Sequence, residues 1–313
     1  MAAGERRRTT MSTASYLPVV DAAGFQAYPA PAKLNLFLHV TGRRADGYHL
    51  LESIFQLVDR QDTIWLRVRP DTAVVHHNPL PGVPAESDLT VRAARLLQQH
   101  TGCQLGVDLR VDKVLPMGGG MGGGSSDAAT VLLALNRLWQ LNLSRAALMA
   151  LGVQLGADVP FFLFGRTALV EGIGEIMTPI AVPEQQFVVL HPAVHVPTPA
   201  IFGAPDLPRN TASVKAALLA GEVDWMQLHN DLQAVAVAKF PLIGAQLDWL
   251  NQFAPARMTG SGSCVFAAFA RQSAQKNASQ NQADAVISCL LEGMTGFTCS
   301  SISQHQLLDF ATD

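Results

Sequence analysis

Residues 116–130 form a glycine-rich stretch that constrains this chain more than any other segment. The stretch reads PMGGGMGGGSSDAAT, with a run of three glycines on each side of Met121. Glycine permits backbone conformations that other residues avoid, and it lets a ligand approach without meeting a Cβ atom. Successive backbone N–H groups in such a loop can form a concave cradle for an anion.

The glycine stretch leads directly into the expected start of a helix. Ser125, Ser126 and Asp127 are residue types that cap helix N-termini. Unpaired N–H groups and the helix dipole favour negative charge there, so we predict a phosphate site. A flexible linker or a close helix-packing contact is the alternative, but a linker is not expected between an apolar strand and an amphipathic helix. The apolar positions at helical spacing are Val131, Leu132, Leu135, Leu138 and Trp139.

The loop differs from two common nucleotide-binding fingerprints. A Walker A loop ends in Gly-Lys-Ser or Gly-Lys-Thr, and this sequence does not. A dinucleotide-binding fingerprint needs an acidic residue about twenty positions further on. The chain has Leu143, Ser144 and Arg145 there, which disfavours a plain dinucleotide-binding oxidoreductase.

The composition limits the remaining classes of protein. A length of 313 residues suits two domains or one large one. The formal net charge of −3 disfavours nucleic acid as the main partner. The sequence has no run of about 18 apolar residues, so we expect no membrane-spanning helix. The cysteines lack metal-type spacing, which is typical of a reduced cytoplasmic protein; they are Cys103, Cys264, Cys289 and Cys299.

We interpret residues 1–28 as a disordered extension, or as the result of a start codon placed too early, with Met11 as an alternative start. The segment lacks the apolar region and the cleavage site of a secretory signal. Glu5 and Asp21 disfavour a transit peptide.

A second informative block covers residues 29–69. The segment LNLFLHV alternates in the manner of a strand, and Lys33 and Asn35 lie at its start on one face. The loop GRRADGYH then presents Tyr48 and His49 together. Each feature alone is ordinary at a protein surface. Lys33 also suits a phosphate or carboxylate partner, and Tyr48 with His49 offers a base both a π face and a hydrogen-bonding ring.

Three further segments contain candidate site residues. Asp158 lies in GADVP ahead of the apolar PFFLF, where a turn or helix cap is the ordinary interpretation. The proline-rich HPAVHVPTPAIFGAP predicts an extended loop rather than a helix. We interpret His191 and His195 in that loop as structural, because no third metal ligand is suitably spaced. Residues 258–269, MTGSGSCVFAAF, predict a Gly-Ser turn that runs into a strand.

These segments together resemble the motifs of the GHMP kinases, which are named for galactose, homoserine, mevalonate and phosphomevalonate. The resemblance runs from about residue 29 to about residue 270. It implies an α+β fold with an active site in the cleft between two domains. The expected N-terminal domain, residues 29–183, has a mixed sheet with helices of the ribosomal S5 domain 2-like kind. The expected C-terminal domain, residues 184–313, has an antiparallel sheet backed by helices.

The segment PAKLNLFLHVTGRRADGYH is more specific than the glycine loop. It is similar to the opening motif of those GHMP kinases that phosphorylate the 2-hydroxyl of a cytidine diphosphate-linked methylerythritol in the non-mevalonate isoprenoid pathway. The resemblance implies ATP and Mg²⁺ as cofactors. We further expect a small-molecule substrate, no nucleic-acid or membrane partner, a monomer or weak homodimer, and a cytoplasmic location.

Two alternatives remain open at this stage. One is another GHMP kinase, of the homoserine or mevalonate type, which would not need Tyr48 and His49. The other is a non-catalytic protein that binds ATP as a sensor, which should have lost Lys33 or Asp158.

The resemblance also implies roles for individual residues. Asp158 would accept the proton of the attacking hydroxyl, and Lys33 beside it would keep it ionised and offset charge on the γ-phosphate. The family commonly has Asn where this chain has Asp88, which can cap a helix but offers adenine no amide donor. The implied ATP-binding residues are Lys113, Pro116, Met117, Gly118, Gly119, Gly120, Met121, Gly122, Gly123, Gly124, Ser125, Ser126 and Asp127.

The implied acceptor pocket contains Phe202 stacked on the base opposite Tyr48. Gly260, Ser261 and Gly262 of the third motif would lie near the phosphates. No dedicated carboxylate cage for a metal is recognisable, so Mg²⁺ would be held by phosphate oxygens, with the Ser126 hydroxyl as the one candidate ligand. The implied substrate-binding residues are Asn35, Tyr48, His49, Thr198 and Phe202.

Overall fold

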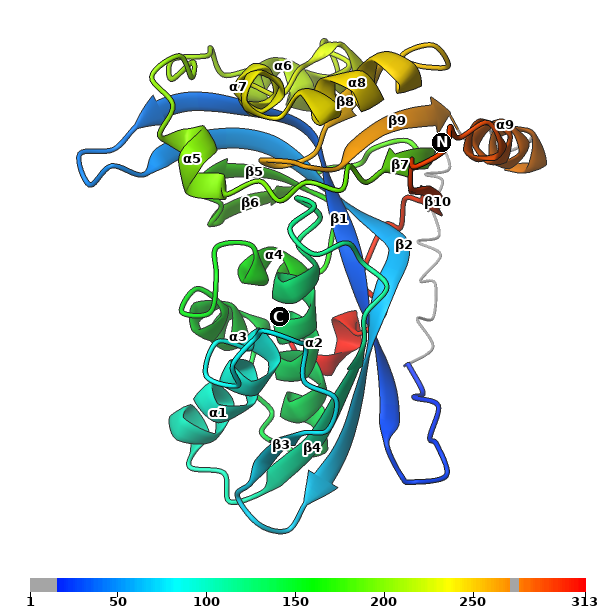
Figure 1. Cartoon of the computed structure of the whole chain (residues 1–313). Helices are drawn as coiled ribbons and strands as arrows, with labels where there is room; N and C mark the ends of the chain where they lie inside the picture. The colour runs from blue at the N-terminus through cyan, green and yellow to red at the C-terminus, as the bar shows by residue number, and fades with distance from the viewer. Residues whose placement is uncertain (1–15, 271–275) are drawn as a thin grey trace, which may run out of the picture.

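The computed structural model describes residues 16–270 and 276–313, which form a lower and an upper layer in Figure 1. A sheet in the order β3-β4-β2-β5-β6, with β1 also paired to β2, runs from the lower layer, where β3 and β4 lie, up to β5 and β6 beneath the upper layer (Figure 1). β3 and β4 run parallel and the other neighbours run antiparallel, so the sheet is mixed. The strands are β1 (Gln26–Arg43), β2 (His49–Arg69), β3 (Val74–His76), β4 (Gly106–Asp112), β5 (Ala168–Gly172) and β6 (Ile176–Pro179).

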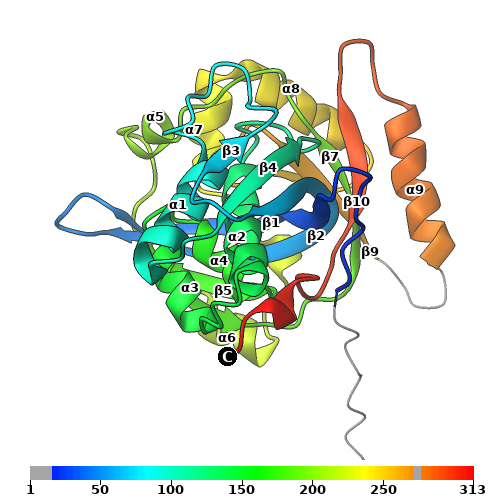
Figure 2. The ribbon, with the colours of Figure 1, turned by 90° about the horizontal axis from the view of Figure 1, so that it is seen from below.

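Helices cover one face of this mixed sheet (Figures 1 and 2). α2 lies at the centre, and its residues from Ala128 to Leu135 are buried against the strands. Asp88 caps α1 by accepting a hydrogen bond from the backbone N–H of Thr90 at 2.8 Å. The helices are α1 (Leu89–Thr101), α2 (Gly123–Leu138), α3 (Arg145–Gly152) and α4 (Val159–Phe164).

The upper layer is an antiparallel sheet in the order β10-β7-β9-β8, with α9 beside β10 and β7 (Figure 2). Its strands are β7 (Gln185–Leu190), β8 (Ala256–Met258), β9 (Val265–Ala270) and β10 (Gly296–Ser300). Its helices are α5 (Thr198–Phe202), α6 (Lys215–Ala220), α7 (Leu232–Lys239), α8 (Pro241–Leu250) and α9 (Lys276–Ser288), and 3₁₀ turns occur at Trp225–Gln227 and Leu308–Phe310. The predicted α+β architecture is confirmed.

The two layers share chain segments. The β1–β2 hairpin reaches from the lower core into the upper one, where Leu38 and Val40 are buried among residues of α7 and β9. The C-terminal segment returns to the lower core, where Phe310 packs edge-on against Tyr28 with ring centroids 6.0 Å apart. A boundary at residues 183 and 184 therefore separates the sheets, while the first hairpin and the last residues cross it.

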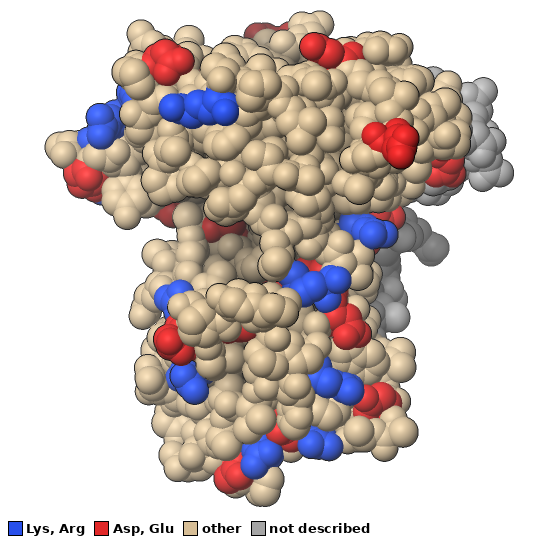
Figure 3. Space-filling model, in the orientation of Figure 1, with Lys and Arg blue, Asp and Glu red and all other residues tan. Residues whose placement is uncertain are grey.

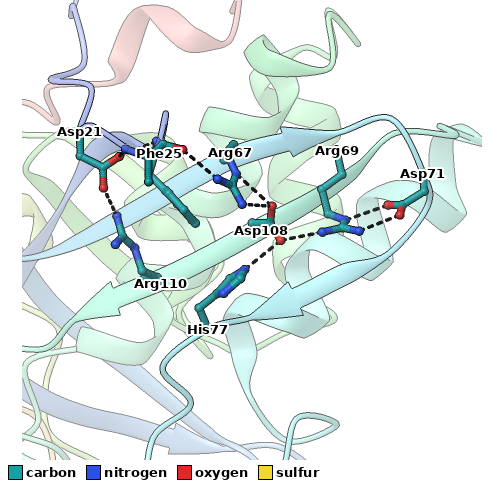
Figure 4. A network of polar contacts seen from close by, with 9 residues as sticks. Asp21, Phe25, Arg67, Arg69, Asp71, His77, Asp108 and Arg110 are labelled. Carbon is teal, nitrogen blue, oxygen red and sulfur yellow. Dashed lines mark hydrogen bonds and ion pairs between the residues drawn. The ribbon is translucent and has the colours of Figure 1, made fainter.

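Residues 16–28 belong to the fold, which differs from the expected disordered extension; residues 1–15 lie outside the described residues. Phe25 is 4 % exposed, and the guanidinium groups of Arg67 and Arg110 lie over its ring at 4.6 and 3.9 Å. Asp21 forms an ion pair with Arg110 (Figure 4). These contacts pin the segment to the outer face of β2 and β4.

The arginines of that outer face are neutralised within the protein. Asp108 accepts hydrogen bonds from Arg67, Arg69 and His77, each with a contact at 2.9 Å (Figure 4). Burial alone would raise the pKa of Asp108, but these hydrogen bonds outweigh it and lower the pKa to about 2. The cluster is therefore a structural brace. On the face drawn in Figure 3, basic and acidic side chains are likewise interspersed.

None of the helices within residues 16–270 and 276–313 combines the length and the apolar character that a membrane crossing requires.

Candidate active site

The glycine loop holds its carbonyl groups toward the protein and leaves N–H groups free. The carbonyl oxygens of Gly119 and Met121 accept from the backbone N–H groups of Cys264 and Lys33, at 3.1 and 3.0 Å. The first-turn N–H groups of α2, at positions 123–125, have no acceptor in the described part of the chain. A helix N-terminus with free donors favours an anion. The loop therefore has the geometry of a phosphate cradle.

The start of α2 corrects one detail of the sequence analysis. The helix begins at Gly123, and Gly122 precedes it with a left-handed φ of 73°. Ser125 to Asp127 therefore lie in the first turn instead of capping it. Glycine reaches this φ without strain, so the backbone turns into the helix three residues before the first side chain, Ser125, that was predicted to cap it.

The two serines of this turn have different surroundings. The Ser126 hydroxyl is fully buried and donates to the carbonyl oxygen of Pro31 at 2.6 Å. It joins α2 to β1, so the structure does not support Ser126 as a magnesium ligand. Ser125 lines both cavities that meet at the loop, and its hydroxyl is the one available to a ligand.

Lys113 lies between two buried carboxylates next to the loop. Its Nζ contacts Asp127 at 2.8 Å and forms a still closer ion pair with Asp62. The other oxygen of Asp62 accepts from the backbone N–H groups of Val114 and Leu115. One ammonium group thus faces two carboxylates. Burial, and then the charge of Asp62, raise the pKa of Asp127 to about 7 against the opposing effect of Lys113.

We expect Asp127→Asn to stabilise the protein at pH 8 and to matter less at pH 5. The folded-state pKa of Asp127 lies above its ordinary value of 3.8, so its stabilising contribution is complete below that value and is lost as pH rises through about 7. Asparagine has nearly the same shape without the charge, and we expect a gain on the order of 1 kcal/mol at pH 8. Thermal unfolding between pH 5 and 8.5 measures it.

Asp112→Asn is the matched control, because Asp112 is exposed and lies next to Lys113. Asp112→Asn should leave the pH dependence of the melting temperature as it is in the wild type. If Asp127→Asn is less stable than the wild type at pH 8, Lys113 needs both carboxylates and the electrostatic argument is wrong.

A cavity of about 370 Å³ lies on the α1 side of the loop. Asp88, Leu89 and Lys113 line it together with the loop itself. Asp88 contacts His76 Nδ1 at 3.1 Å, and hydrogen bonds from His76 and Thr90 outweigh the effect of burial and lower its pKa to about 2. Asp88 is therefore an ionised acceptor at the cavity wall. The implied ATP-binding residues that line this cavity are Lys113, Pro116, Met117, Gly118, Gly119, Gly120, Met121, Gly122, Gly123, Gly124, Ser125 and Asp127.

A second cavity, of about 1010 Å³, lies on the other side of the loop between the two layers. It shares Gly118, Gly120, Gly122 and Ser125 with the first, so the two meet at the phosphate cradle. The molecule in Figure 3 is hollowed at this level. The predicted site residues that line the second cavity are Lys33, Asn35, Tyr48, His49, Asp158, Thr198, Phe202, Gly260, Ser261 and Gly262.

Lys33 and Asp158 form a pair within this cavity, although 125 positions of sequence separate them. Lys33 Nζ lies 3.5 Å from Asp158 Oδ2, donates to Asn35 Oδ1 at 2.5 Å, and lies 4.5 Å from the centre of the Phe55 ring. Lys33 is 3 % exposed, whereas the Asp158 side chain is 34 % exposed. Asp158 precedes α4 without capping it through its side chain. Its carboxylate is therefore held by Lys33 and remains accessible to a ligand.

Asn35 connects the pair to the third motif. Its amide nitrogen donates to Ser53 Oγ at 3.1 Å, and its backbone N–H donates to Thr259 Oγ1 at 2.9 Å. Thr259 in turn lies against the carbonyl oxygen of Gly120. The side chain of Asn35 is thus occupied in orienting Lys33 and bracing the site.

The Gly-Ser turn of the third motif is held by a residue that the sequence analysis did not assign. Asn230 Nδ2 donates to the carbonyl oxygens of Met258 and Gly260, each at 2.8 Å. Ser261 Oγ contacts Thr198 Oγ1 at 2.8 Å across the cavity mouth. The sequence signal for Asn230 is that residues 229–232, His-Asn-Asp-Leu, resemble a family helix segment that packs near the active site, which we interpreted as structural. That signal does not reveal the partners of Asn230.

The aromatic wall of the cavity also differs in detail from expectation. The segment predicted as an extended loop contains α5, because a proline in the first helical turn needs no N–H partner. The rings of Phe202 and His49 are in contact, with centroids 5.1 Å apart, and Tyr48 is 61 % exposed. His195, interpreted as structural, lines the cavity beside Gly118.

No group of three or more His, Cys, Asp or Glu side chains suited to a metal occurs within residues 16–270 and 276–313.

Comparison with known proteins places this geometry in a family. Residues 88–166 match the family described as GHMP kinases N terminal domain, and residues 214–292 match GHMP kinases C terminal. The chain is 55 % identical to the 4-diphosphocytidyl-2-C-methyl-D-erythritol kinase of Thiobacillus denitrificans, over 92 % of this chain and 99 % of that protein. It is 60 % identical to the protein of the same name from Ralstonia pickettii, over 77 % of this chain and 84 % of that one.

Solved structures agree with these matches. A crystal structure of a 4-(cytidine 5'-diphospho)-2C-methyl-D-erythritol kinase superposes with a TM-score of 0.69 at 34 % identity, covering 88 % of this chain and 98 % of that one. A homoserine kinase from Cytophaga hutchinsonii superposes with a TM-score of 0.66 at 18 % identity, covering 90 % and 95 %. The second likeness concerns the fold alone.

Proposed function

This chain belongs to the GHMP kinases, and we propose on that premise that it transfers the γ-phosphate of ATP to the 2-hydroxyl of 4-diphosphocytidyl-2-C-methyl-D-erythritol. The products are the 2-phosphate and ADP, and the reaction belongs to the non-mevalonate route to isoprenoid precursors. The observation that carries the proposal is the Lys33–Asp158 pair in the large cavity that meets the glycine loop. The close relatives bear the name of this kinase.

ATP would span the glycine loop, with the base in the smaller cavity and the γ-phosphate at the junction with the larger one. The free N–H groups at the start of α2 would bind the β- and γ-phosphates. Phosphoryl transfer depends mainly on positioning and on neutralising charge, and these are what a rigid N–H cradle and a fixed lysine supply.

Asp158 would accept the proton of the attacking 2-hydroxyl. Its carboxylate is accessible and lies 3.5 Å from the Lys33 ammonium, which orients it. Lys33 lies among Asn35, Phe55 and Asp158, so it has little freedom to move away. The same ammonium would offset the charge that develops on the transferred phosphate.

Mg²⁺ fits this site as an ion carried by the nucleotide. The described residues offer no protein cage for it, and the Ser125 hydroxyl lines both cavities at the loop. When bound, the ion would neutralise the phosphate charge.

We expect Phe202→Ala to raise the KM for the cytidine acceptor roughly tenfold or more and to leave the KM for ATP nearly unchanged. Stacking of a base on an aromatic ring contributes roughly 1–3 kcal/mol, and Phe202 lines only the larger cavity. Steady-state kinetics with each substrate varied in turn measures the two constants. Phe253→Ala is the control, since Phe253 is 41 % exposed and lines neither cavity. An equal rise in the KM for the acceptor and the KM for ATP would show that Phe202 is not part of the acceptor pocket.

The function itself is tested by ATP consumption with three separate acceptors, in the presence and absence of Mg²⁺. The acceptors are 4-diphosphocytidyl-2-C-methyl-D-erythritol, mevalonate and homoserine. Turnover with the first alone supports the proposal. Turnover with another acceptor would keep the phosphate cradle and overturn the cytidine pocket, and ATP binding without any turnover would favour a sensor.

We also propose a cytoplasmic location, no nucleic-acid or membrane partner, and a monomer or weak homodimer. The metabolic name of the relatives supports the location. The formal net charge of −3 gives no general attraction to nucleic acid. Light scattering over a range of protein concentrations would measure the oligomeric state, and a concentration-independent tetramer would contradict it.

A further inference from the structure

Arg209 lies next to His49 and Phe202, the two ring residues in contact at the wall of the larger cavity, and it forms hydrogen bonds with both. Its Nε donates to His49 Nε2 at 3.1 Å. One terminal nitrogen donates to the carbonyl oxygens of Phe202 and Ala204, at 3.2 and 2.6 Å, and the other donates to Leu207 at 3.0 Å. Arg209 is not among the described residues that line the cavity. It therefore acts on any ligand there through its neighbours.

The hydrogen bond from Arg209 determines which nitrogen of His49 carries the proton. A guanidinium group can only donate, so Nε2 must accept, and a neutral imidazole that accepts at Nε2 has its proton on Nδ1. Burial, followed by the charges of Arg209 and Arg43, lowers the pKa of His49 and keeps the ring neutral. Within the described residues nothing accepts from Nδ1, so its N–H is available to a ligand.

We propose that Arg209 is a positioning residue that makes His49 a fixed hydrogen-bond donor and thereby selects cytosine over uracil. This inference rests on the proposed function. At ring position 3 cytosine has a bare nitrogen that accepts a hydrogen bond, whereas uracil has an N–H. His49 lines the cavity, and a fixed Nδ1–H there would pair with that position of cytosine and oppose the N–H of uracil. A site with a fixed polar group discriminates strongly, because the wrong ligand leaves that group unpaired.

The same guanidinium also fixes the stacking ring. Its bond to the Phe202 carbonyl oxygen holds the end of α5 against His49, and the two rings lie 5.1 Å apart. Rings this close are in direct contact, so a base fits beside them rather than between them. Stacking alone accepts any base. Arg209 thus holds together the Phe202 ring, which can stack on any base, and the His49 Nδ1–H group, which hydrogen-bonds to one edge of the base.

The tautomer can be measured without any substrate. The full chain is labelled with ¹⁵N-histidine, and the ring nitrogens of His49, assigned with a His49→Gln variant, are observed by long-range ¹H–¹⁵N NMR at pH 8. We expect the Nδ1–H form in the wild type and a mixture of the two neutral forms in Arg209→Gln. Arg44→Gln is the control, because Arg44 lies in the same loop and pairs with Asp46. An Nε2–H form in the wild type, or no change in Arg209→Gln, would overturn the proposal.

The selectivity is measured as the ratio of kcat/KM for the cytidine acceptor to that for its uridine analogue. Arg209→Gln should lower this ratio roughly tenfold or more, while the KM for ATP stays within about twofold. Arg209→Lys keeps the charge without the planar fork and should lose selectivity too. If Arg209→Lys kept the wild-type selectivity, the positive charge alone would explain the preference for cytosine, and the proposal would be overturned. If the wild type uses neither acceptor, the proposed function fails, and the NMR result still decides the role of Arg209.

Discussion

The Asp158→Asn protein should bind ATP normally and lose most of its turnover. Removing a positioned general base typically lowers the rate by roughly 10²–10⁴. Asparagine keeps the size of Asp158 but cannot take the proton of the acceptor hydroxyl, and its neutral amide no longer pairs with Lys33 Nζ, now 3.5 Å from the carboxylate. The smaller cavity, on the α1 side of the loop, does not contain Asp158, so nucleotide affinity should change little.

Two measurements together test this prediction. ADP release at saturating substrates gives kcat, and calorimetric titration with a non-hydrolysable ATP analogue gives the affinity. Asp71→Asn is the matched control, since Asp71 pairs with Arg69 on the distant sheet edge and its side chain is 54 % exposed (Figure 4). Wild-type kcat in Asp158→Asn would show that positioning by Lys33 and the loop suffices without a base. A joint loss of turnover and ATP affinity would indicate a structural role instead.

The glycine loop and the Lys33–Asp158 pair could be selected as candidate site residues from the sequence because their signals are local. A glycine run before an apolar helical pattern specifies a cradle whatever lies around it. Lys33 and Asp158 each sit in a short motif that resembles the family pattern. Their separation of 3.5 Å depends on β1 and α4 packing against α2, and only the fold supplies that.

Residues that act through long-range contacts gave no comparable signal. Arg209 follows a proline in a segment without helical or strand pattern, and the segment of Asn230 resembles a family helix that packs near the active site without revealing which groups it contacts. Each forms its decisive hydrogen bonds with residues distant in sequence, such as His49 for Arg209 and Gly260 for Asn230. Side-chain capping likewise misplaced the start of α2, since it cannot anticipate a left-handed Gly122.

The Gly120→Ala protein should lose ATP binding far more than it loses stability. Gly120 has a φ of +76°, and a Cβ atom there would lie 2.3 Å from the Thr259 carbonyl oxygen and 3.1 Å from that of Gly262. Both neighbours are backbone atoms of the third motif, so the loop itself must shift. A displacement near 1 Å in a site that depends on positioning can lower activity roughly 10²-fold. We expect a comparable loss of affinity for the nucleotide.

Gly102→Ala is the control that separates the effect of backbone strain from the effect of the close contact with the third motif. Gly102 ends α1 with a φ of +68°, and nothing lies within 4 Å of its added Cβ atom. Both substitutions carry the backbone strain of a left-handed alanine, roughly 1–2 kcal/mol, so Gly102→Ala measures the loss of melting temperature that the strain alone causes. Only Gly120→Ala should weaken ATP binding. Equal ATP affinities in the two variants would mean that the loop accommodates a methyl group, and the close contact between loop and third motif would not control nucleotide binding.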